Sequence, residues 1–204
     1  MRSMSTSHTA DTPHTRENIL AHGQRIMAGK GFSAVGLNEI LTASGVPKGS
    51  FYHYFGSKDA FGVALLDNYF DTYLAEIDAI LATPGLDMSQ RLMKYWEAWQ
   101  DNQSFSECQG KCLAVKLGAE VADLSEDMRL SLKRGATSLT ARLTQAIQAG
   151  VAEGSLSIDG TPQDVADSLY QLWLGASIMV KIVRNPQPFA TAMSTTRKIL
   201  HLPA

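Results

Sequence analysis

Residues 36–58 read GLNEILTASGVPKGSFYHYFGSK, and this stretch decides the fold expected for the first part of the chain. Apolar residues recur at helical spacing in its first half and again in its second half. Gly45 separates the two halves, and glycine adopts a left-handed turn without steric cost. The pattern predicts two short helices joined by a tight turn, with these apolar positions: Leu37, Ile40, Leu41, Val46, Phe51 and Phe55.

The second short helix has an outward face that is basic, aromatic and hydroxyl-bearing. Helix-turn-helix proteins place such a helix in the major groove of DNA, where its side chains contact phosphates and base edges. A solvated surface with a few core rings is the alternative, but the complete motif is present and favours binding of double-stranded DNA. The outward residues are Lys48, Gly49, Ser50, Tyr52, His53 and Tyr54.

Helical periodicity continues on both sides of this motif. One helix is expected from Arg16 to Gly29, and Ser57 can cap a long helix that ends at Thr83-Pro84-Gly85. No strand pattern is present, so the predicted fold class is all-α, with about nine helices. The remaining helical segments lie at about 86–103, 110–123, 126–151, 162–184 and 187–201.

Three regions are expected along the chain. Residues 1–15 are polar and aperiodic, which predicts a flexible N-terminal arm. Residues 16–62 form a three-helix DNA-binding head, and residues 63–204 form a helical body for effector sensing and dimerisation. The head carries five basic and two acidic side chains between residues 16 and 58, a net charge of +3 within a chain of net charge −2. DNA would therefore attract one end of the molecule and repel the other.

Composition excludes several classes of protein. Two cysteines in 204 residues, no apolar leader and no apolar run of membrane-spanning length argue against secretion, a disulfide framework or a membrane protein. The expected location is the cytoplasm, with association to the nucleoid when DNA is bound. The five histidines and two cysteines lack metal-ligand spacing, and no phosphate-binding loop is present, so neither a metal nor another cofactor is expected.

A segment near residues 165–183 is apolar almost all round, so it must be buried on more than one side. One face can pack on its own core and another against a second copy of the chain, which predicts a homodimer. A two-fold dimer places two recognition helices about 34 Å apart, the repeat of B-DNA, and so matches a palindromic operator.

The head closely resembles the N-terminal domain of TetR-type transcriptional repressors, through residues 19–61, ILAHGQRIMAGKGFSAVGLNEILTASGVPKGSFYHYFGSKDAF. The body resembles the electrophile-sensing branch related to the N-ethylmaleimide-responsive and acrylate-responsive regulators, through KCLAVKLGAEVADLSEDMR at 111–129 and LYQLWLGASIMVKI at 169–182. The resemblance implies an all-α homodimer that leaves a palindromic operator when a small molecule alters the body.

The family pattern also assigns DNA contacts. It points to the outward residues of the second short helix, to Lys58 as a phosphate contact, and to Asn38 as a contact with a base or the backbone. Lysine suits phosphate or guanine acceptors, and hydroxyl groups can donate to phosphate. Many relatives carry threonine where Gly36 stands, so the helix cap and the phosphate contact of that hydroxyl are missing here.

Cys112 has two interpretations. Free cysteines are commonly buried as small apolar side chains. However, Lys111 and Lys116 and a helix beginning near Gly110 would favour the thiolate. The resemblance adds that this position is the reactive cysteine in the related sensors. Cys108, beside Glu107, ranks second, as a resolving thiol or a bystander.

Lys181 is the basic residue on the apolar segment near 165–183. It either extends to solvent at the helix end or faces Cys112, where it would lower the thiol pKa and could trap a sulfenic acid. Four aromatic side chains are candidates for lining an effector pocket, although such residues more often belong to the core. They are Trp96, Trp99, Tyr170 and Trp173.

The sequence therefore predicts a TetR-type repressor released from DNA when Cys112 reacts with an electrophile or oxidant. A repressor induced by a non-covalent ligand is the alternative, and a thiol enzyme acting on small electrophiles is a remote one. An enzyme would have no use for the basic head.

Overall fold

The computed structural model describes residues 13–102 and 112–203, and within those ranges every regular element is an α-helix. The predicted fold class is confirmed. Cys108 and Lys111 lie outside the described residues. The helices are α1 (Pro13–Lys30), α2 (Leu37–Ser44), α3 (Lys48–Phe55), α4 (Lys58–Leu81), α5 (Met88–Asn102), α6 (Leu113–Leu124), α7 (Glu126–Glu153), α8 (Pro162–Val183) and α9 (Gln187–Ile199).

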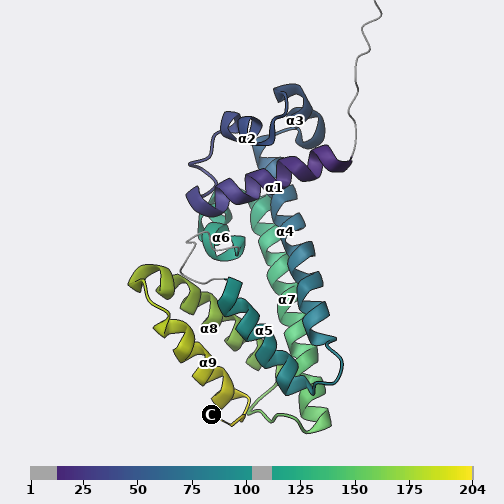
Figure 1. The fold of residues 1–204 in the computed structure, drawn as a ribbon, viewed down its shortest axis with the longest axis vertical. Coiled ribbons are helices and arrows are strands. Elements are labelled where there is room, and N and C mark those ends of the chain that lie inside the picture. Colours follow the sequence, from purple (N-terminus) through teal and green to yellow (C-terminus); the bar gives the residue numbers. More distant parts are fainter. Residues whose placement is uncertain (1–12, 103–111, 204) are drawn as a thin grey trace, which may run out of the picture.

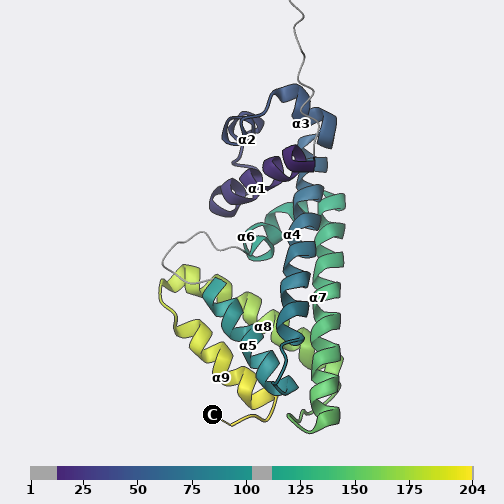
Figure 2. The ribbon, with the colours of Figure 1, turned by 45° about the vertical axis from the view of Figure 1, so that its right-hand side comes forward.

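The molecule is elongated, with α1, α2 and α3 at one end and α5, α8 and α9 at the other (Figures 1 and 2). The long helices α4 and α7 lie side by side and join the two ends in both views. The short helix α6 lies beneath α1, between the head and the rest of the body. Helix α6 is therefore one of the parts of the body that contact the head.

Local sequence signals explain most helix ends. Gly45 has a φ of 68° and closes α2, which confirms the expected left-handed turn. The Ser57 hydroxyl accepts a hydrogen bond of 3.0 Å from the Ala60 N–H, so the predicted cap of α4 is also confirmed. Gly36 gives α2 no side-chain cap. Helix α1 begins at Pro13, three residues before the predicted start at Arg16, because proline suits the first turn of a helix.

Two apolar clusters hold the fold together. The body cluster is built around Trp96 and Trp173, whose rings stack with centroids 4.9 Å apart. The head cluster contains Phe51 and Phe55, as predicted, but it continues past residue 62. Its members from the body side include Leu65, Leu66, Tyr69, Phe70, Cys112, Leu113, Leu117, Val121 and Met128. Apolar packing thus runs without interruption from the DNA-binding motif to the first part of α6 and α7.

Large apolar side chains are exposed at the C-terminal end of α8. Ile178, Met179, Ile182 and Val183 are each between 41% and 66% exposed in the single chain. This is the helix whose sequence predicts a dimer interface, and the exposed residues lie on the face that its own core leaves uncovered. Within the described ranges, no helix combines the length and apolar character needed to cross a bilayer.

Candidate DNA-binding face and cysteine site

The predicted recognition helix presents most of its predicted readers to solvent. Lys48, Gly49, Tyr52 and His53 are exposed, while Ser50 and Tyr54 are half-buried. Phe51 and Phe55 hold the helix down: each packs against Phe61 of α4, with ring centroids 5.3 and 5.0 Å apart. The Lys48 ammonium lies 5.8 Å from the centre of the Tyr52 ring. The motif is therefore rigid on its inner side and polar on its outer side.

Two predicted contacts outside α3 have different surroundings. Asn38 is exposed on α2. Lys58 is half-buried, donates a hydrogen bond of 2.9 Å to the carbonyl oxygen of Phe32, and lies 4.5 Å from the centre of that ring. Its ammonium thus already binds the turn between α1 and α2, which competes with the phosphate contact that the family pattern suggests.

A shallow pocket brings the start of α1 next to the recognition helix, which the sequence did not reveal. His14 and Thr15 line it together with Ser50. The Asn18 side-chain amide donates a hydrogen bond of 2.9 Å to the Ser44 carbonyl and fixes α1 against the helix-turn-helix. The first turn of α1 therefore extends the polar face around Ser50.

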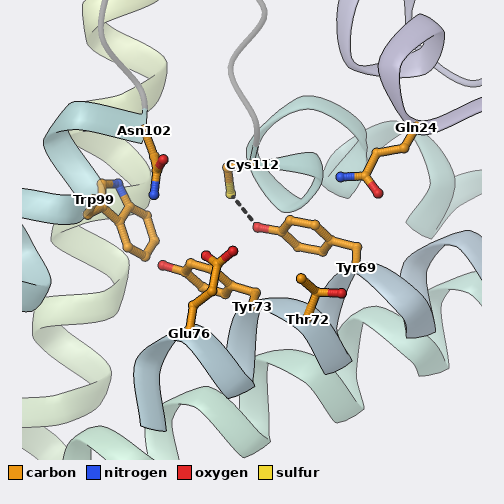
Figure 3. Close-up of a pocket in the computed structure, with 8 residues that line it drawn as sticks. All are labelled: Gln24, Tyr69, Thr72, Tyr73, Glu76, Trp99, Asn102 and Cys112. Carbon is orange, nitrogen blue, oxygen red and sulfur yellow. Dashed lines mark hydrogen bonds between the residues drawn. The ribbon is translucent and has the colours of Figure 1, made fainter. Parts of the chain in front are cut away.

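Cys112 is the residue before the first turn of α6 and is only 7% exposed. The Tyr69 hydroxyl of α4 donates a hydrogen bond of 3.2 Å to its sulfur (Figure 3). Burial raises the pKa of the thiol, whereas the Tyr69 hydrogen bond, the N–H groups of the first turn of α6 and the positive charge of Lys181 act in the opposite direction. Burial prevails. The start of α6 thus acts on the thiol pKa in the expected direction, but burial outweighs it.

Lys181 is exposed in the single chain, as expected for a lysine that extends to solvent. Its charge still acts on the sulfur, since it lowers the thiol pKa. Lysine side chains can keep the ammonium in water while the alkyl chain covers apolar surface. The lysine therefore influences Cys112 without being a buried charge.

A pocket of about 180 Å³ opens beside Cys112. It lies between α4, α5 and the end of α1, and Figure 3 shows its side chains arranged around the thiol and the Tyr69 hydroxyl. Of the four aromatic residues predicted to form a pocket, only Trp99 lines it. Trp96 and Trp173 are fully buried in the body cluster, and Tyr170 packs against Trp99 with centroids 6.0 Å apart. The lining residues are Gln24, Tyr69, Thr72, Tyr73, Glu76, Trp99, Asn102 and Cys112.

A carboxylate on α6 joins this helix to the head. Glu120 accepts hydrogen bonds from the N–H groups of Phe32 (3.0 Å) and Ser33 (2.7 Å), in the turn between α1 and α2. Its partial burial raises the pKa of the carboxyl, but the bonds from Ser33 and Phe32 and the charge of Lys116 prevail and leave it lowered. The same turn receives the Lys58 ammonium. Sequence reasoning missed Glu120, because a single glutamate on a helix gives no sign of a partner 87 residues away.

Comparison with known proteins matches both parts of the chain to one family. Residues 19–65 match the bacterial regulatory proteins of the tetR family, and residues 89–196 match the tetracyclin repressor-like C-terminal domain. The chain belongs to the TetR family. The TetR relatives include the HTH-type transcriptional repressor NemR of Escherichia coli, which is 40% identical over 190 residues covering 93% of this chain and 96% of NemR.

Two other TetR-family relatives extend the comparison. The transcriptional regulator AcuR of Cereibacter sphaeroides is 36% identical over 83% of this chain and 80% of its own length. The transcriptional repressor DhaR of a Mycobacterium species is 32% identical over 88% of both chains. The crystal structure of the reduced form of E. coli NemR superposes with a TM-score of 0.88, over 94% of this chain and 99% of that one. The predicted family and its NemR-like branch are confirmed, and the protein is a TetR-type transcriptional repressor rather than an enzyme.

Proposed function

We propose that this TetR-type repressor binds a palindromic operator as a homodimer and leaves it when Cys112 is modified by a reactive electrophile or oxidant. One observation carries the proposal: Cys112 belongs to the apolar cluster of the DNA-binding head and also lines a pocket. A molecule that enters the pocket and bonds to the sulfur adds atoms to the core that supports the recognition helix.

The chemistry needs the thiolate, which forms when the thiol releases its proton to solvent. With an activated alkene such as a maleimide, the sulfur lone pair forms an S–C bond and the alkene pair moves to the adjacent carbon, which takes a proton from water. The net reaction adds S–H across the double bond. With a hydroperoxide, the thiolate is oxidised to a sulfenic acid while the peroxide is reduced to an alcohol or water. Condensation of the Lys181 amine with the sulfenic acid then forms an S–N bond and releases water.

The energetic consequence follows from packing. Overfilling a dense core costs about 1–3 kcal/mol, and allosteric coupling energies are of the same size. Modification therefore favours an arrangement in which the two recognition helices no longer match successive major grooves. The Glu120 bonds to the turn between α1 and α2 offer a direct path from α6 to the head.

Operator binding tests the proposal. The DNA upstream of the gene is titrated with the protein before and after N-ethylmaleimide treatment, and mass spectrometry identifies the modified cysteine. Cys108→Ser is the matched control, since it removes the other cysteine of the chain. We expect release of DNA by wild type and Cys108→Ser, and retained binding by Cys112→Ser. Full alkylation of Cys112 without loss of binding would refute the switch.

The pocket beside Cys112 supports a second candidate, a repressor induced by a non-covalent ligand. Both candidates predict release from DNA on addition of the inducer. They differ in Cys112→Ser, which keeps the response to a non-covalent ligand and loses the response to an electrophile.

A further inference from the structure

We propose that Tyr69 is the positioning residue for Cys112, whose hydroxyl holds the sulfur toward the pocket, stabilises the thiolate and thereby sets the rate at which electrophiles react. The inference rests on the proposed function, since it takes Cys112 to be the residue that is modified. It assigns to an aromatic residue of α4 a part in the chemistry that its place in an apolar core would not suggest.

The geometry of Tyr69 is specific to this role. Its hydroxyl donates to the Cys112 sulfur at 3.2 Å, and both side chains are buried, with exposures of 6% and 7%. Hydrogen bonds to an ionised acceptor are roughly twice as strong as those between neutral groups. The bond therefore gains strength when the thiol loses its proton, which favours the reactive form.

Neighbouring rings fix the hydroxyl in place. The Tyr69 ring stacks on Tyr73 with centroids 5.8 Å apart and an interplanar angle of 9°, and it meets Phe70 edge-on at 5.1 Å. The Tyr73 hydroxyl is bonded to that of Tyr95 at 3.1 Å, so Tyr73 is itself anchored. Because packing on several sides fixes the Tyr69 ring, its hydroxyl stays oriented toward the sulfur when the thiol loses its proton.

The protonation states agree with this role. Burial raises the pKa of Tyr69 well above its ordinary value, so the phenol keeps its proton and remains a donor. Burial also raises the pKa of the Cys112 thiol, and the Tyr69 bond is the largest influence that lowers it. The titratable groups whose charges interact with this thiol are Tyr69 and Tyr73 on α4, Tyr95 on α5, and Tyr170 and Lys181 on α8.

Tyr69→Phe tests the inference, because it removes the hydroxyl and keeps the ring. The rate of N-ethylmaleimide addition to Cys112 is measured against pH in a Cys108→Ser background. Loss of the bond should raise the midpoint of the pH profile by about one unit, which slows alkylation near neutral pH about tenfold. The limiting rate at high pH should change less. Thr196→Val is the matched control, since it removes a buried hydroxyl that bonds to Trp173 of the body cluster instead of to the sulfur or its neighbours.

The result that overturns the inference is a Tyr69→Phe profile with the wild-type midpoint, or an equal shift of the midpoint in Thr196→Val. If Tyr69→Phe does not fold, a ring-fluorinated tyrosine at position 69 provides the second variant. Its hydroxyl is a stronger donor, so the midpoint should fall, and an unchanged midpoint would contradict the inference. These outcomes are separate from the proposed function, which fails instead if alkylated wild type keeps its operator.

Discussion

Replacing Glu120 by alanine tests whether α6 holds the head in its DNA-binding arrangement. The carboxylate accepts two hydrogen bonds from the turn between α1 and α2, at 2.7 and 3.0 Å. A buried hydrogen bond to a charged group contributes about 1.5–3 kcal/mol to stability. Because solvent screens this half-buried carboxylate, we take about 2 kcal/mol for its two hydrogen bonds together. Such an energy corresponds to a factor of about 30 in an equilibrium constant. It matches the usual size of an allosteric coupling.

We therefore expect Glu120→Ala to weaken operator binding by the unmodified protein by about 10- to 30-fold. Alkylation of Cys112 should then cause little further loss, because the connection that it disrupts is already absent. Fluorescence anisotropy with labelled operator measures both affinities, and mass spectrometry confirms equal alkylation. Glu126→Ala is the control of equal charge, since its carboxylate pairs with Arg129 on α7 at 2.6 Å.

Acid titration provides a second measure of the same bonds. The pKa of Glu120 is lowered in the folded protein because the bonds from Ser33 and Phe32 outweigh the effect of burial. Its stabilisation is therefore fully present above the ordinary carboxyl pKa of 4.5 and is lost as pH falls through the lower folded value. Wild type should unfold with a larger free energy than Glu120→Gln above pH 4.5, and this difference should shrink as the pH falls below 4.5. In the anisotropy experiment, the link between α6 and the head would be refuted if Glu120→Ala bound the operator with wild-type affinity and still released it fully on alkylation of Cys112.

Three further substitutions test the fold and the DNA-binding face. Gly135→Ala should lower the free energy of unfolding, measured in urea, by about 1–3 kcal/mol, because a Cβ at this position would overlap the Phe70 ring. An unchanged urea midpoint would contradict the close approach of α4 and α7. Thr196→Val should lower the free energy of unfolding, measured by thermal denaturation, by about 1–3 kcal/mol, because the buried Trp173 N–H loses its acceptor at 2.9 Å. An unchanged stability would show that this hydrogen bond does not stabilise the fold. Lys48→Ala should weaken operator binding about tenfold and reduce its salt slope by about one, if the ammonium meets phosphate; an unaltered slope would place it elsewhere.

The helices were predictable because their signals are local. Apolar spacing, Gly45 and Ser57 act within a few residues, and α4 ends at Leu81, close to the predicted break at Thr83-Pro84-Gly85. The readers of α3 follow from the same pattern, since Phe51 and Phe55 fix which face is buried. Their roles on DNA stay predictions. The boundary at residue 62 also stays a prediction, although apolar packing crosses it.

The site around Cys112 was harder to predict because it depends on contacts between distant helices. Helical spacing marks Trp96 and Trp173 as apolar, but it does not distinguish a ring that fills the core from one that lines a pocket. The Tyr69 hydroxyl meets Cys112 from 43 residues away, and Glu120 meets Ser33 from 87. The residue pattern within a single helix does not predict such pairs. The thiol pKa likewise depends on burial, which outweighs the neighbouring positive charge.

Cys112 and the recognition helix share one apolar cluster, which shortens the path of the proposed signal. Cys112 belongs to the same cluster as Phe51 and Phe55 of that helix, so its modification would reach the head without a long path through the body. Two polar connections join the α6 region to the head. The Tyr69 bond to Cys112 reaches α4, which begins at Lys58 in the head, and Glu120 of α6 reaches the turn after α1. Because the packed interior resists added volume, a bulky adduct should displace α6 from α4 more than the loss of a proton does. Release from DNA should therefore increase with the size of the group on sulfur, and Cys112→Ser should leave operator binding intact.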